Sequence, residues 1–527
     1  MKPLTFAPCP RLANMEGVSE ANNQSVPEQI RIRAEKRQRL IDDGRNPYPI
    51  AVPITHTLSQ VREKYPNLAA GEETEDFVGV AGRVVFSRNT GKLCFVTLQQ
   101  GDGTRLQAML SAAQVGKESL SDYKADVDLG DHLFVYGRVI ASKRGELSVM
   151  AQPGAEGQPA WQLTAKSLRP LPKTFKTEDG QEVSLSEDQR VRHREVDMIT
   201  REAAREMVRT RAQVVASLRA TLSGEDFIEV ETPMLQTLHG GAAARPFVTH
   251  MNAYDTDLYL RIAPELFLKR CLVGGIDRVF EINRNFRNEG ADSSHSPEFT
   301  MLEAYQAYGN YRQIAELTRH LVQNAAQAAL GTTVATLPNG ESYDLGGEWD
   351  WIDLYGSLSA ALGQDISPRT PREELVKLAE AREIEVEKFY SPGKLVELLW
   401  EAEVGDDLYA PTFVADFPED TSPLVKSHPE KPGQVQKWDL YVRGFELATG
   451  YSELNDPVIQ RERFEAQSLD AANGDPEAMQ VDEEFLQAIE AGMPPAGGMG
   501  MGLDRLLMAI TGLGIRETIT FPLVKRI

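Results

Sequence analysis

Residues 76–172 consist of short runs rich in β-branched and aromatic residues, and this texture limits the possible fold more than any other feature of the chain. The runs are FVGVAGRVVFSR, LCFVTLQQ, RLQAMLS, HLFVYGRVIAS and ELSVMAQ. Turn-forming residues separate them, and no long helical pattern lies between most of them. Short strands at this spacing are typical of a small barrel. We therefore expect a barrel such as the OB-fold, with a β-sandwich as the alternative.

The chain has 527 residues, and a prior of about 100–200 residues per domain predicts two to four domains. Residues 1–27 are polar and aperiodic, so we expect a disordered tail. A helical segment is expected over 28–75, ahead of the barrel. Breaker residues predict a linker over 173–200. The largest domain should span 201–527 and contain a mainly helical insertion at about 312–435, which makes the chain a multidomain α+β protein.

Several features of the chain limit its class. No apolar run approaches the roughly 18 residues of a membrane span, and the N-terminus lacks the apolar stretch of a signal peptide. Cys9, Cys94 and Cys271 are far apart, with no CxxC and no His at ligand spacing. This argues against a disulfide framework or a structural zinc and favours a cytoplasmic protein.

The net charge of −22 argues mildly against a polyanionic partner, because phosphate binding draws on Lys and Arg. Net charge nevertheless says little about local patches. One stretch, RIRAEKRQRL at residues 31–40, is clearly basic. A solvated helix face is the simpler interpretation. Packing on a neighbouring element and contact with a nucleic acid are the alternatives.

The segment RVFEINRNFRNEGADSSHSPEFTMLEAYQAY predicts a hairpin with one polar face. Burying that many polar groups is costly unless a ligand satisfies them. Such a face offers the cation of Arg287 for a phosphate or carboxylate, the ring of Phe299 for a flat base, and the carboxylate of Glu303 for an amine. A hairpin with one solvated face is the alternative. The residues of the predicted face are Glu281, Asn283, Asn285, Arg287, Phe299, Met301, Glu303 and Tyr305.

Two further segments predict parts of a site. In WDLYVRGFELATGYSELND, a turn at Arg443–Gly444 would pair Tyr441 with Glu446 and place Asp439 diagonal to Glu446. Two such carboxylates suit Mg²⁺ held with substrate phosphates, although a pair of surface acids is the simpler interpretation. In PPAGGMGMGLDRLLMAI, glycines precede a helix whose first turn contains Arg505. That cation opposes the helix dipole, which indicates an anionic or π-rich partner, or a salt bridge.

The three segments together resemble the signature motifs of class II aminoacyl-tRNA synthetases. The helix and strand that end in EVETP resemble motif one, with Pro233 at a dimer interface. NFRNEG resembles motif two and GMGLDR resembles motif three. Three matches in this order behind an OB domain are much more specific than any one of them. The resemblance implies a catalytic domain with an antiparallel β-sheet flanked by helices, and a homodimer.

Within this class, an OB domain ahead of the catalytic domain resembles the subclass for lysine, aspartate and asparagine. The segments HGGAAARPF, YLRIAPELFLKR, SSHSPEFTMLEAYQAY and GYSELND resemble bacterial lysyl-tRNA synthetases. This resemblance covers the chain from about residue 28 onward. It implies lysine, ATP and a lysine-accepting tRNA as partners, with Mg²⁺ as cofactor. The absence of GxxxxGK[ST], HEXXH and GxSxG argues against P-loop, metalloprotease and serine-hydrolase chemistry.

The resemblance also implies residue roles. Arg287 and Arg505 are the implied catalytic residues, since Arg287 would contact the α-phosphate of ATP and Arg505 would stack on adenine opposite Phe299. The implied ATP contacts are Arg287, Glu289, His295, Phe299, Glu446 and Arg505. The implied metal ligands are Asp439 and Glu446. The implied lysine contacts are Gly241, Glu265, Arg287, Glu303, Tyr305, Thr449, Tyr451 and Glu453. The implied anticodon contacts in the barrel are Arg88, Phe95, Gln107 and Glu146.

Among the implied lysine contacts, Glu265 and the Gly241 backbone would bind the α-amino group, and Glu303, Tyr305 and Glu453 would bind the ε-amino group. Paired carboxylates around a buried ammonium would favour lysine over neutral or acidic side chains, and polar discrimination of this kind can reach about 10⁴–10⁵ without editing.

Two positions depart from the pattern of the resembled enzymes. Thr449 stands where many members have Asn, and Asp439 stands where Glu is common. Three alternatives remain open at this point: an aspartyl or asparaginyl enzyme of the same subclass, a protein-lysylating paralogue, and a non-catalytic tRNA-binding descendant.

Overall fold

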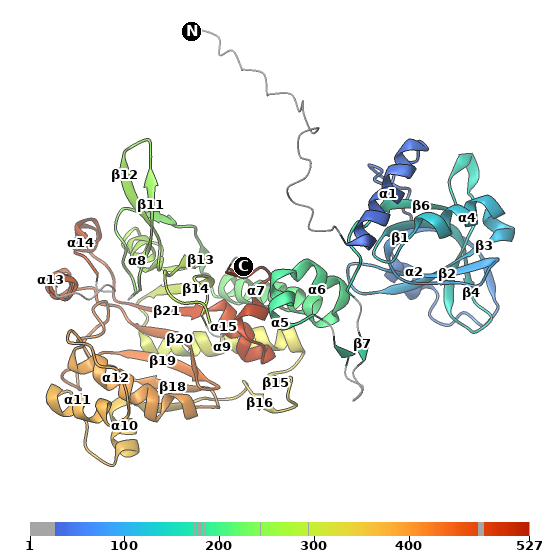
Figure 1. Cartoon of the computed structure of the whole chain (residues 1–527). Helices are drawn as coiled ribbons and strands as arrows, with labels where there is room; N and C mark the ends of the chain where they lie inside the picture. The colour runs from blue at the N-terminus through green and yellow to red at the C-terminus, as the bar shows by residue number, and fades with distance from the viewer. Residues whose placement is uncertain are drawn as a thin grey trace, which may run out of the picture. The chain divides into compact units, whose positions relative to one another are not determined.

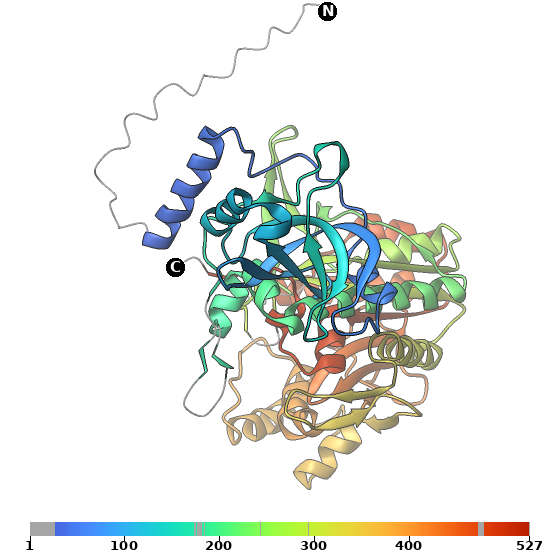
Figure 2. The same ribbon diagram turned by 90° about the vertical axis from the view of Figure 1, so that its right-hand side faces the viewer.

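The computed structural model contains two compact units, the barrel unit (Met1–Ser186) and the large unit (Glu187–Ile527). Each has its own hydrophobic core. Figures 1 and 2 show the barrel at the blue end of the chain and the large sheet with its helices toward the red end. The tail expected at 1–27 lies almost wholly outside the described residues. The described residues are 27–172, 175–176, 182–183, 185–242, 244–292, 295–472 and 479–525.

Six strands form the barrel, in the order β1-β2-β3-β5-β4-β6. The first strand also pairs with β4, and this pairing closes the sheet into a barrel rather than a sandwich. Two short helices, α3 (Ala112–Val115) and α4 (Lys117–Asp126), connect β3 to β4. The OB-type barrel that the sequence predicts is therefore confirmed. The strands are β1 (Glu73–Asn89), β2 (Leu93–Gln99), β3 (Arg105–Ser111), β4 (His132–Ala141), β5 (Leu147–Ala151) and β6 (Trp161–Ala165).

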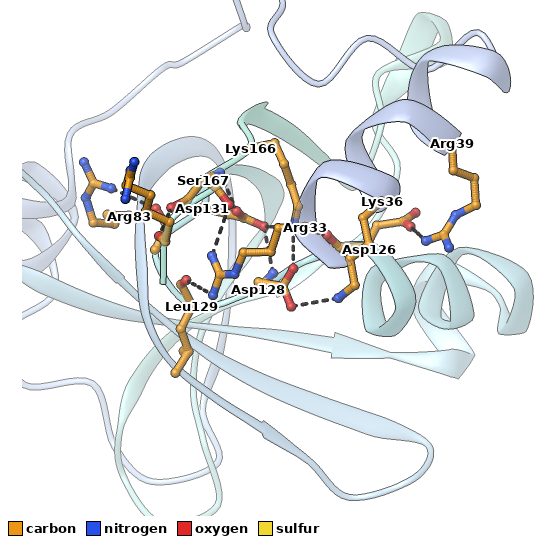
Figure 3. A network of polar contacts seen from close by, with 12 residues as sticks. Arg33, Lys36, Arg39, Arg83, Asp126, Asp128, Leu129, Asp131, Lys166 and Ser167 are labelled. Carbon is orange, nitrogen blue, oxygen red and sulfur yellow. Dashed lines mark hydrogen bonds and ion pairs between the residues drawn. The ribbon is translucent and has the colours of Figure 1, made fainter. Parts of the chain in front are cut away.

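Charged side chains fasten the basic helix α1 (Glu28–Asp42) to the barrel (Figure 3). Arg33 donates to the carbonyl oxygens of Leu129 (2.9 Å) and Ser167 (3.1 Å). Lys36 pairs with Asp128 at 2.7 Å. Arg39 pairs with Asp126. The basic stretch is thus not merely a solvated face, because three of its cations bind the barrel.

Beneath α1, Lys166 is buried and pairs with Asp128 (2.5 Å) and Asp131 (2.8 Å), as Figure 3 shows. Arg45, which follows α1, pairs with Asp126 at 2.7 Å. Every aspartate of this aspartate cluster (Asp126, Asp128 and Asp131) therefore has a cationic partner. The short helix α2 (Leu58–Lys64) packs on the same unit and begins with a capping box formed by Thr57 and Gln60.

Where the sequence predicts a linker up to residue 200, the large unit begins with two helices, α5 (Glu187–Arg192) and α6 (Arg194–Thr200). Val191 is buried, and a buried ion pair joins Arg194 to Asp197 at 2.8 Å. A single buried side chain and an ion pair produce no helical repeat of apolar residues. The sequence pattern therefore did not reveal these helices. The small hairpin of β7 (Phe175–Lys176) and β8 (Glu182–Val183) precedes them.

An eight-stranded sheet, largely antiparallel, organises the large unit in the order β17-β18-β19-β20-β21-β14-β13-β9. The helices α7 (Glu202–Gly224), α9 (Tyr311–Leu330) and α15 (Leu503–Thr511) share one core with its apolar face. Figure 1 shows α9 running along the strands. Polar residues of the central strands lie on the other face. The strands are β9 (Ile228–Glu229), β13 (Arg278–Phe286), β14 (Glu298–Ala307), β17 (Asp350–Asp353), β18 (Thr412–Ala415), β19 (Lys437–Val442), β20 (Phe445–Ser452) and β21 (Ala496–Gly502).

The insertion expected at about 312–435 is less helical than the sequence predicts. Its first helix, α9, belongs to the main core, and β17 and β18 extend the main sheet. These two strands have four residues each, too few for a period-two signal. A separate helical cluster remains between them, built from α10 (Leu354–Leu362), α11 (Arg372–Glu380) and α12 (Pro392–Glu403).

The remaining elements complete the two units. Among the described residues, no helix is long and apolar enough to cross a membrane. The remaining strands are β10 (Leu235–Gln236), β11 (Phe247–Met251), β12 (Thr256–Leu260), β15 (Val334–Thr336) and β16 (Ser342–Asp344). The remaining helices are α8 (Glu265–Val273), α13 (Pro457–Ala472), α14 (Glu483–Glu490) and α16 (Ile515–Thr518), with short 3₁₀ turns at Ala155–Gly157 and Gly405–Asp407.

Candidate active site

The predicted polar hairpin is present as β13 and β14, which pair Glu281 with Glu303 and Asn285 with Phe299. On its other side, β14 pairs with the glycine-rich strand β21, where Gly498 lies opposite Tyr305. A Cβ atom at Gly498 would lie 2.1 Å from Oε1 of Glu453 and 2.5 Å from the Tyr305 ring. Glycine is therefore required there, because any side chain would displace these two groups.

A cavity of about 300 Å³ lies over these strands. It contains residues from the hairpin, from the start of α8 and from β20. All the lysine contacts implied by the sequence line it except Glu453, which is fully buried behind the wall. The lining residues among them are Gly241, Glu265, Arg287, Glu303, Tyr305, Thr449 and Tyr451.

Glu265 and Glu303 of this cavity each accept a hydrogen bond from a tyrosine hydroxyl. Tyr451 donates its hydroxyl to Glu265 at 2.6 Å, and Tyr305 donates to Glu303 at 3.0 Å. Burial raises the pKa of Glu303 to about 8, and the nearby negative charge of Glu265 adds to the effect. A cationic ligand would lower this pKa and stabilise both carboxylates.

Behind the cavity, the buried ammonium of Lys269 bridges two carboxylates, at 2.7 Å from Glu265 and 2.6 Å from Glu453. Burial alone lowers the pKa of Lys269, but the two facing carboxylates outweigh it and raise the pKa overall. Burial also raises the pKa of Glu453 to about 8, although Lys269 opposes the rise. Oε1 of Glu453 has no hydrogen-bond partner among the described residues. Lys269 thus pairs with two carboxylates, and Glu303 adds a third acid to the wall of the same cavity.

The sequence did not identify Lys269 as a site residue. Its signal was available, because Glu265 and Lys269 are four residues apart on α8 and therefore lie on the same side of the helix. The pairing with Glu453 brings together residues 184 positions apart, which no local pattern reveals. Glu453 is fully buried and does not line the cavity, so its contact with the ε-amino group stays a prediction.

A second cavity, of about 350 Å³, adjoins the first. The two share Arg287, Met301, Thr449 and Gly500. All six ATP contacts implied by the sequence line the second cavity: Arg287, Glu289, His295, Phe299, Glu446 and Arg505.

Arg287 lies at the junction of the two cavities, with its guanidinium 5.1 Å from the centre of the Phe299 ring. Burial lowers its pKa, with Glu289 and Glu446 opposing the effect. Its buried Nε has no partner among the described residues, so it can donate to an anion. Arg505 donates to the carbonyl oxygen of Glu446 at 2.6 Å, which holds a second guanidinium over the same cavity.

The acids implied as metal ligands lie on neighbouring strands, but not in the predicted register. Tyr441 pairs with Glu446 as expected, whereas a β-bulge then places Asp439 opposite Thr449. A bulge adds one residue to a strand and cannot be derived from alternation alone. Burial raises the pKa of Asp439 to about 7, with the Glu446 charge adding to the rise and Lys437, at 3.1 Å, opposing it.

In the barrel unit, β1 and β2 pair Arg88 with Phe95, and the guanidinium lies 5.0 Å from the ring centre. Gln107 donates to Ser148 at 2.8 Å. Glu146 pairs with Arg62 of α2 at 3.0 Å, a cation that the sequence did not single out. One outer wall of the barrel therefore combines a cation, a ring and an amide, the groups that read single-stranded bases.

Comparison with known proteins agrees with this geometry. The model for tRNA synthetases class II (D, K and N) matches residues 186–525, and the model for the OB-fold nucleic acid binding domain matches residues 78–153. Lysine–tRNA ligase of Kineococcus radiotolerans is 64% identical over 503 residues, which cover 95% of this chain and 98% of that protein. Its counterpart in Mycolicibacterium gilvum is 60% identical over the same shares of both chains.

A bifunctional lysylphosphatidylglycerol biosynthesis protein of Mycolicibacterium vanbaalenii is 46% identical over 512 residues, which cover 96% of this chain and 44% of that protein. The family model covers more than half of the chain, and the OB-fold model matches most of the barrel. The chain therefore belongs to the class II tRNA synthetases of the D, K and N group and is a ligase with an OB-fold nucleic acid binding domain.

Proposed function

We propose that the chain is a lysine–tRNA ligase that converts lysine and ATP to lysyl-adenylate and pyrophosphate and then transfers lysine to the 3′ end of its tRNA. The observation that carries this proposal is the surplus of buried carboxylates at the first cavity, directly beside a cavity with two guanidinium groups. Buried carboxylates can bind an amine, and guanidinium groups can bind the phosphates of a nucleotide. The identity to curated lysine–tRNA ligases supports the same substrate.

In this proposal the α-amino group of lysine binds Glu265, and the ε-amino group binds Glu303 and Tyr305. Aspartate or asparagine in the same cavity would leave these carboxylates without a partner, which is costly in a buried site. The proposed selectivity therefore follows from the carboxylates that the ligand must neutralise. Glu453 contributes through Lys269, which it holds against Glu265.

Activation needs no side-chain base, because the lysine carboxylate is already a nucleophile. One carboxylate oxygen attacks the α-phosphorus, and pyrophosphate leaves with the electron pair of the broken P–O bond. Arg287 lies between the two cavities, where it can bind both the carboxylate and the α-phosphate and so align them. Phe299 and Arg505 are proposed to enclose the adenine between a ring and a guanidinium.

Mg²⁺ is the proposed cofactor, with Asp439 and Glu446 as protein ligands. Glu446 lines the ATP cavity, and Oδ1 of Asp439 is buried without a hydrogen-bond partner among the described residues. No group of three His, Cys, Asp or Glu in the described part of the chain is placed to bind a metal by itself. Two carboxylates fit an ion that takes its other ligands from phosphate oxygens and water, and it would neutralise phosphate charge there.

The barrel is proposed to bind the anticodon through Arg88, Phe95, Gln107 and Glu146, and the chain is proposed to be a cytoplasmic homodimer. Exposed apolar residues near the motif-one strand support the dimer, because monomers rarely leave such patches uncovered. Sedimentation that gave only monomer would exclude the dimer. The exposed residues are Ile228, Leu235, Val248, Met251 and Tyr254.

The decisive experiment is ATP–pyrophosphate exchange by the purified chain, with lysine, aspartate and asparagine offered separately. We expect exchange with lysine alone. Exchange with aspartate or asparagine would contradict the role of the surplus carboxylates. A folded protein that exchanged with none of the three would exclude the ligase function and favour a non-catalytic tRNA-binding role.

A further inference from the structure

The side chain of Phe86 on β1 remains 54% exposed, although it is one of the larger apolar groups of the barrel unit. Other rings of the unit, such as Tyr123, Phe134 and Trp161, are buried. Among the described residues Phe86 has no stacking or cation–π partner. An exposed ring of this size gains free energy when something covers it.

A β-bulge turns this ring outward. Val78, Val80 and Val84 alternate along β1 and point into the barrel core, so residue 86 would point inward if the alternation continued. The register shifts between Val84 and Phe86. After the shift, Ser87 pairs with the buried Val96 and, although itself exposed, has its hydroxyl 3.2 Å from that of the buried Tyr123. Phe86 consequently faces outward, on the side opposite the core.

The outward side is the wall that carries the proposed anticodon contacts. Phe86 pairs with Thr97, and Thr97 in turn pairs with Gln107. Arg88 is two residues further along β1, on the same face, and pairs with Phe95. Phe86 and Phe95 are therefore diagonal neighbours across two strands, about 7–8 Å apart. The ring of Phe86 continues the proposed interface rather than forming a separate patch.

We propose that Phe86 is a second stacking platform of the barrel and binds one base of the anticodon loop, different from the base that stacks on Phe95. The proposal rests on the anticodon role of this wall. Every base presents a flat π-face, and a phenyl ring carries no hydrogen-bonding group. Phe86 therefore adds affinity at one position of the loop without selecting which base stands there.

The test measures binding of an RNA hairpin with the sequence of the lysine tRNA anticodon stem and loop to the full chain, by fluorescence anisotropy. Phe86→Ala and Phe86→Leu should both weaken binding by roughly 5- to 150-fold, the range for loss of one stacked base. Phe86→Trp should bind at least as tightly as the wild type. Leu129→Ala, which removes a side chain that is 46% exposed elsewhere on the unit, should leave binding unchanged.

A second readout separates this proposal from the one on which it rests. Hairpins with 2-aminopurine at single loop positions report stacking by loss of fluorescence. Phe86→Leu should restore fluorescence at one position and Phe95→Leu at another. Equal binding by the Phe86→Leu variant and the wild type, or restoration at the same position for both variants, would overturn the role of Phe86. If Phe95→Leu also had no effect on binding, the anticodon role of the whole wall would be wrong.

Discussion

Each unit of the molecule has a fully buried lysine between two carboxylates, yet the surroundings differ. In the barrel unit, Lys166 lies between Asp128 and Asp131. In the large unit, Lys269 lies between Glu265 and Glu453. The aspartate cluster of the barrel receives further cations from Lys36, Arg39 and Arg45. Around Lys269 the carboxylates outnumber the paired cations. Glu303 is a third carboxylate there, and among the described residues it accepts a hydrogen bond only from the hydroxyl of Tyr305.

The pKa values follow this difference at Asp128 and Glu303, although burial also raises the pKa of Asp131 against the effect of Lys166. Burial alone raises the pKa of Asp128, but Lys166 and Lys36 outweigh it and lower the pKa overall. Burial raises the pKa of Glu303 to about 8, and the hydroxyl of Tyr305 and the charge of Arg261 oppose this rise without cancelling it. A buried cluster whose charges are matched holds the fold together, whereas a cluster with surplus charge of one sign needs a ligand. The following predictions test this distinction.

The largest expected effect comes from removing either buried lysine. Lys166→Met and Lys269→Met should each lower the free energy of unfolding by about 3–5 kcal/mol, because each leaves buried carboxylates without their cation. Calorimetry of both variants measures this loss. Only Lys269→Met should also raise the KM for lysine in pyrophosphate exchange.

The double variant Lys269→Met with Glu453→Gln provides the control. It removes both charges of one pair, so part of the lost stability should return. An unchanged KM for lysine in the Lys269→Met variant would mean that Lys269 is as purely structural as Lys166, and the comparison would fail.

Glu303→Gln should have the next largest effect. It keeps the shape of the side chain but removes the charge that faces the ε-amino group, a loss of about 2–5 kcal/mol for a buried charged pair. Lysine binding should therefore weaken by at least about 30-fold, measured as the KM for lysine, while the KM for ATP changes little. Glu289→Gln, in the ATP cavity, should show the opposite pattern. Parallel losses for both substrates in the Glu303→Gln variant would argue against the assigned role.

The effect of pH on the KM for lysine should be smaller than the effect of Glu303→Gln. Burial raises the pKa values of Glu303 and Glu453 to about 8, and each must ionise to pair with an ammonium, Glu303 with that of the ligand and Glu453 with that of Lys269. The KM for lysine should fall as the pH rises from 6 to 8, by up to about tenfold per unit for each proton released. A KM that stayed constant over this range would exclude titration of these groups.

A rise in pH should strengthen lysine binding but weaken the stability of the folded protein. Between pH of about 4.5 and 8 the folded protein without lysine binds more protons at Glu303 and Glu453 than the unfolded chain does. Its free energy of unfolding should therefore decrease as the pH rises through this window. Melting curves with and without saturating lysine would measure this, and added lysine should restore the stability at pH 8.

The smallest expected effect belongs to Thr449→Asn, which introduces the residue common in the resembled enzymes. Thr449 lines both cavities and lies opposite Asp439. One additional hydrogen bond is worth about 1 kcal/mol, so the KM for lysine should change by no more than about fivefold. A variant that lost activity altogether would show that the bulge between Asp439 and Glu446 depends on threonine at this position.

Local patterns were sufficient wherever a site element is a regular hairpin. The alternation of β13 and β14 predicted that Glu303 and Tyr305 share a face with Phe299, and the turn at Arg443–Gly444 predicted the pairing of Tyr441 with Glu446. These features depend on spacing within one segment, which the sequence contains in full.

Sequence patterns did not predict the features that depend on contacts between distant segments. The bulge that moves Asp439 opposite Thr449 changes the register without any signature residue. Glu453 stays a predicted contact of the ε-amino group, but its pairing with Lys269 of α8 joins distant segments and was not predicted. The helices over residues 187–200 depend on ion pairs such as that of Arg201 with Glu517, 316 positions apart.

The ion pairs between α1 and the barrel affect how the protein responds to ionic strength. A side chain that neutralises a phosphate releases counterions, and each such contact contributes about −0.7 to −0.9 to the slope of log K against log salt. Lys36 and Arg39 already neutralise Asp128 and Asp126, so they have few counterions to release to RNA. Added salt should therefore mainly weaken the ion pairs between this helix and the barrel. It should affect binding of tRNA to the helix only slightly.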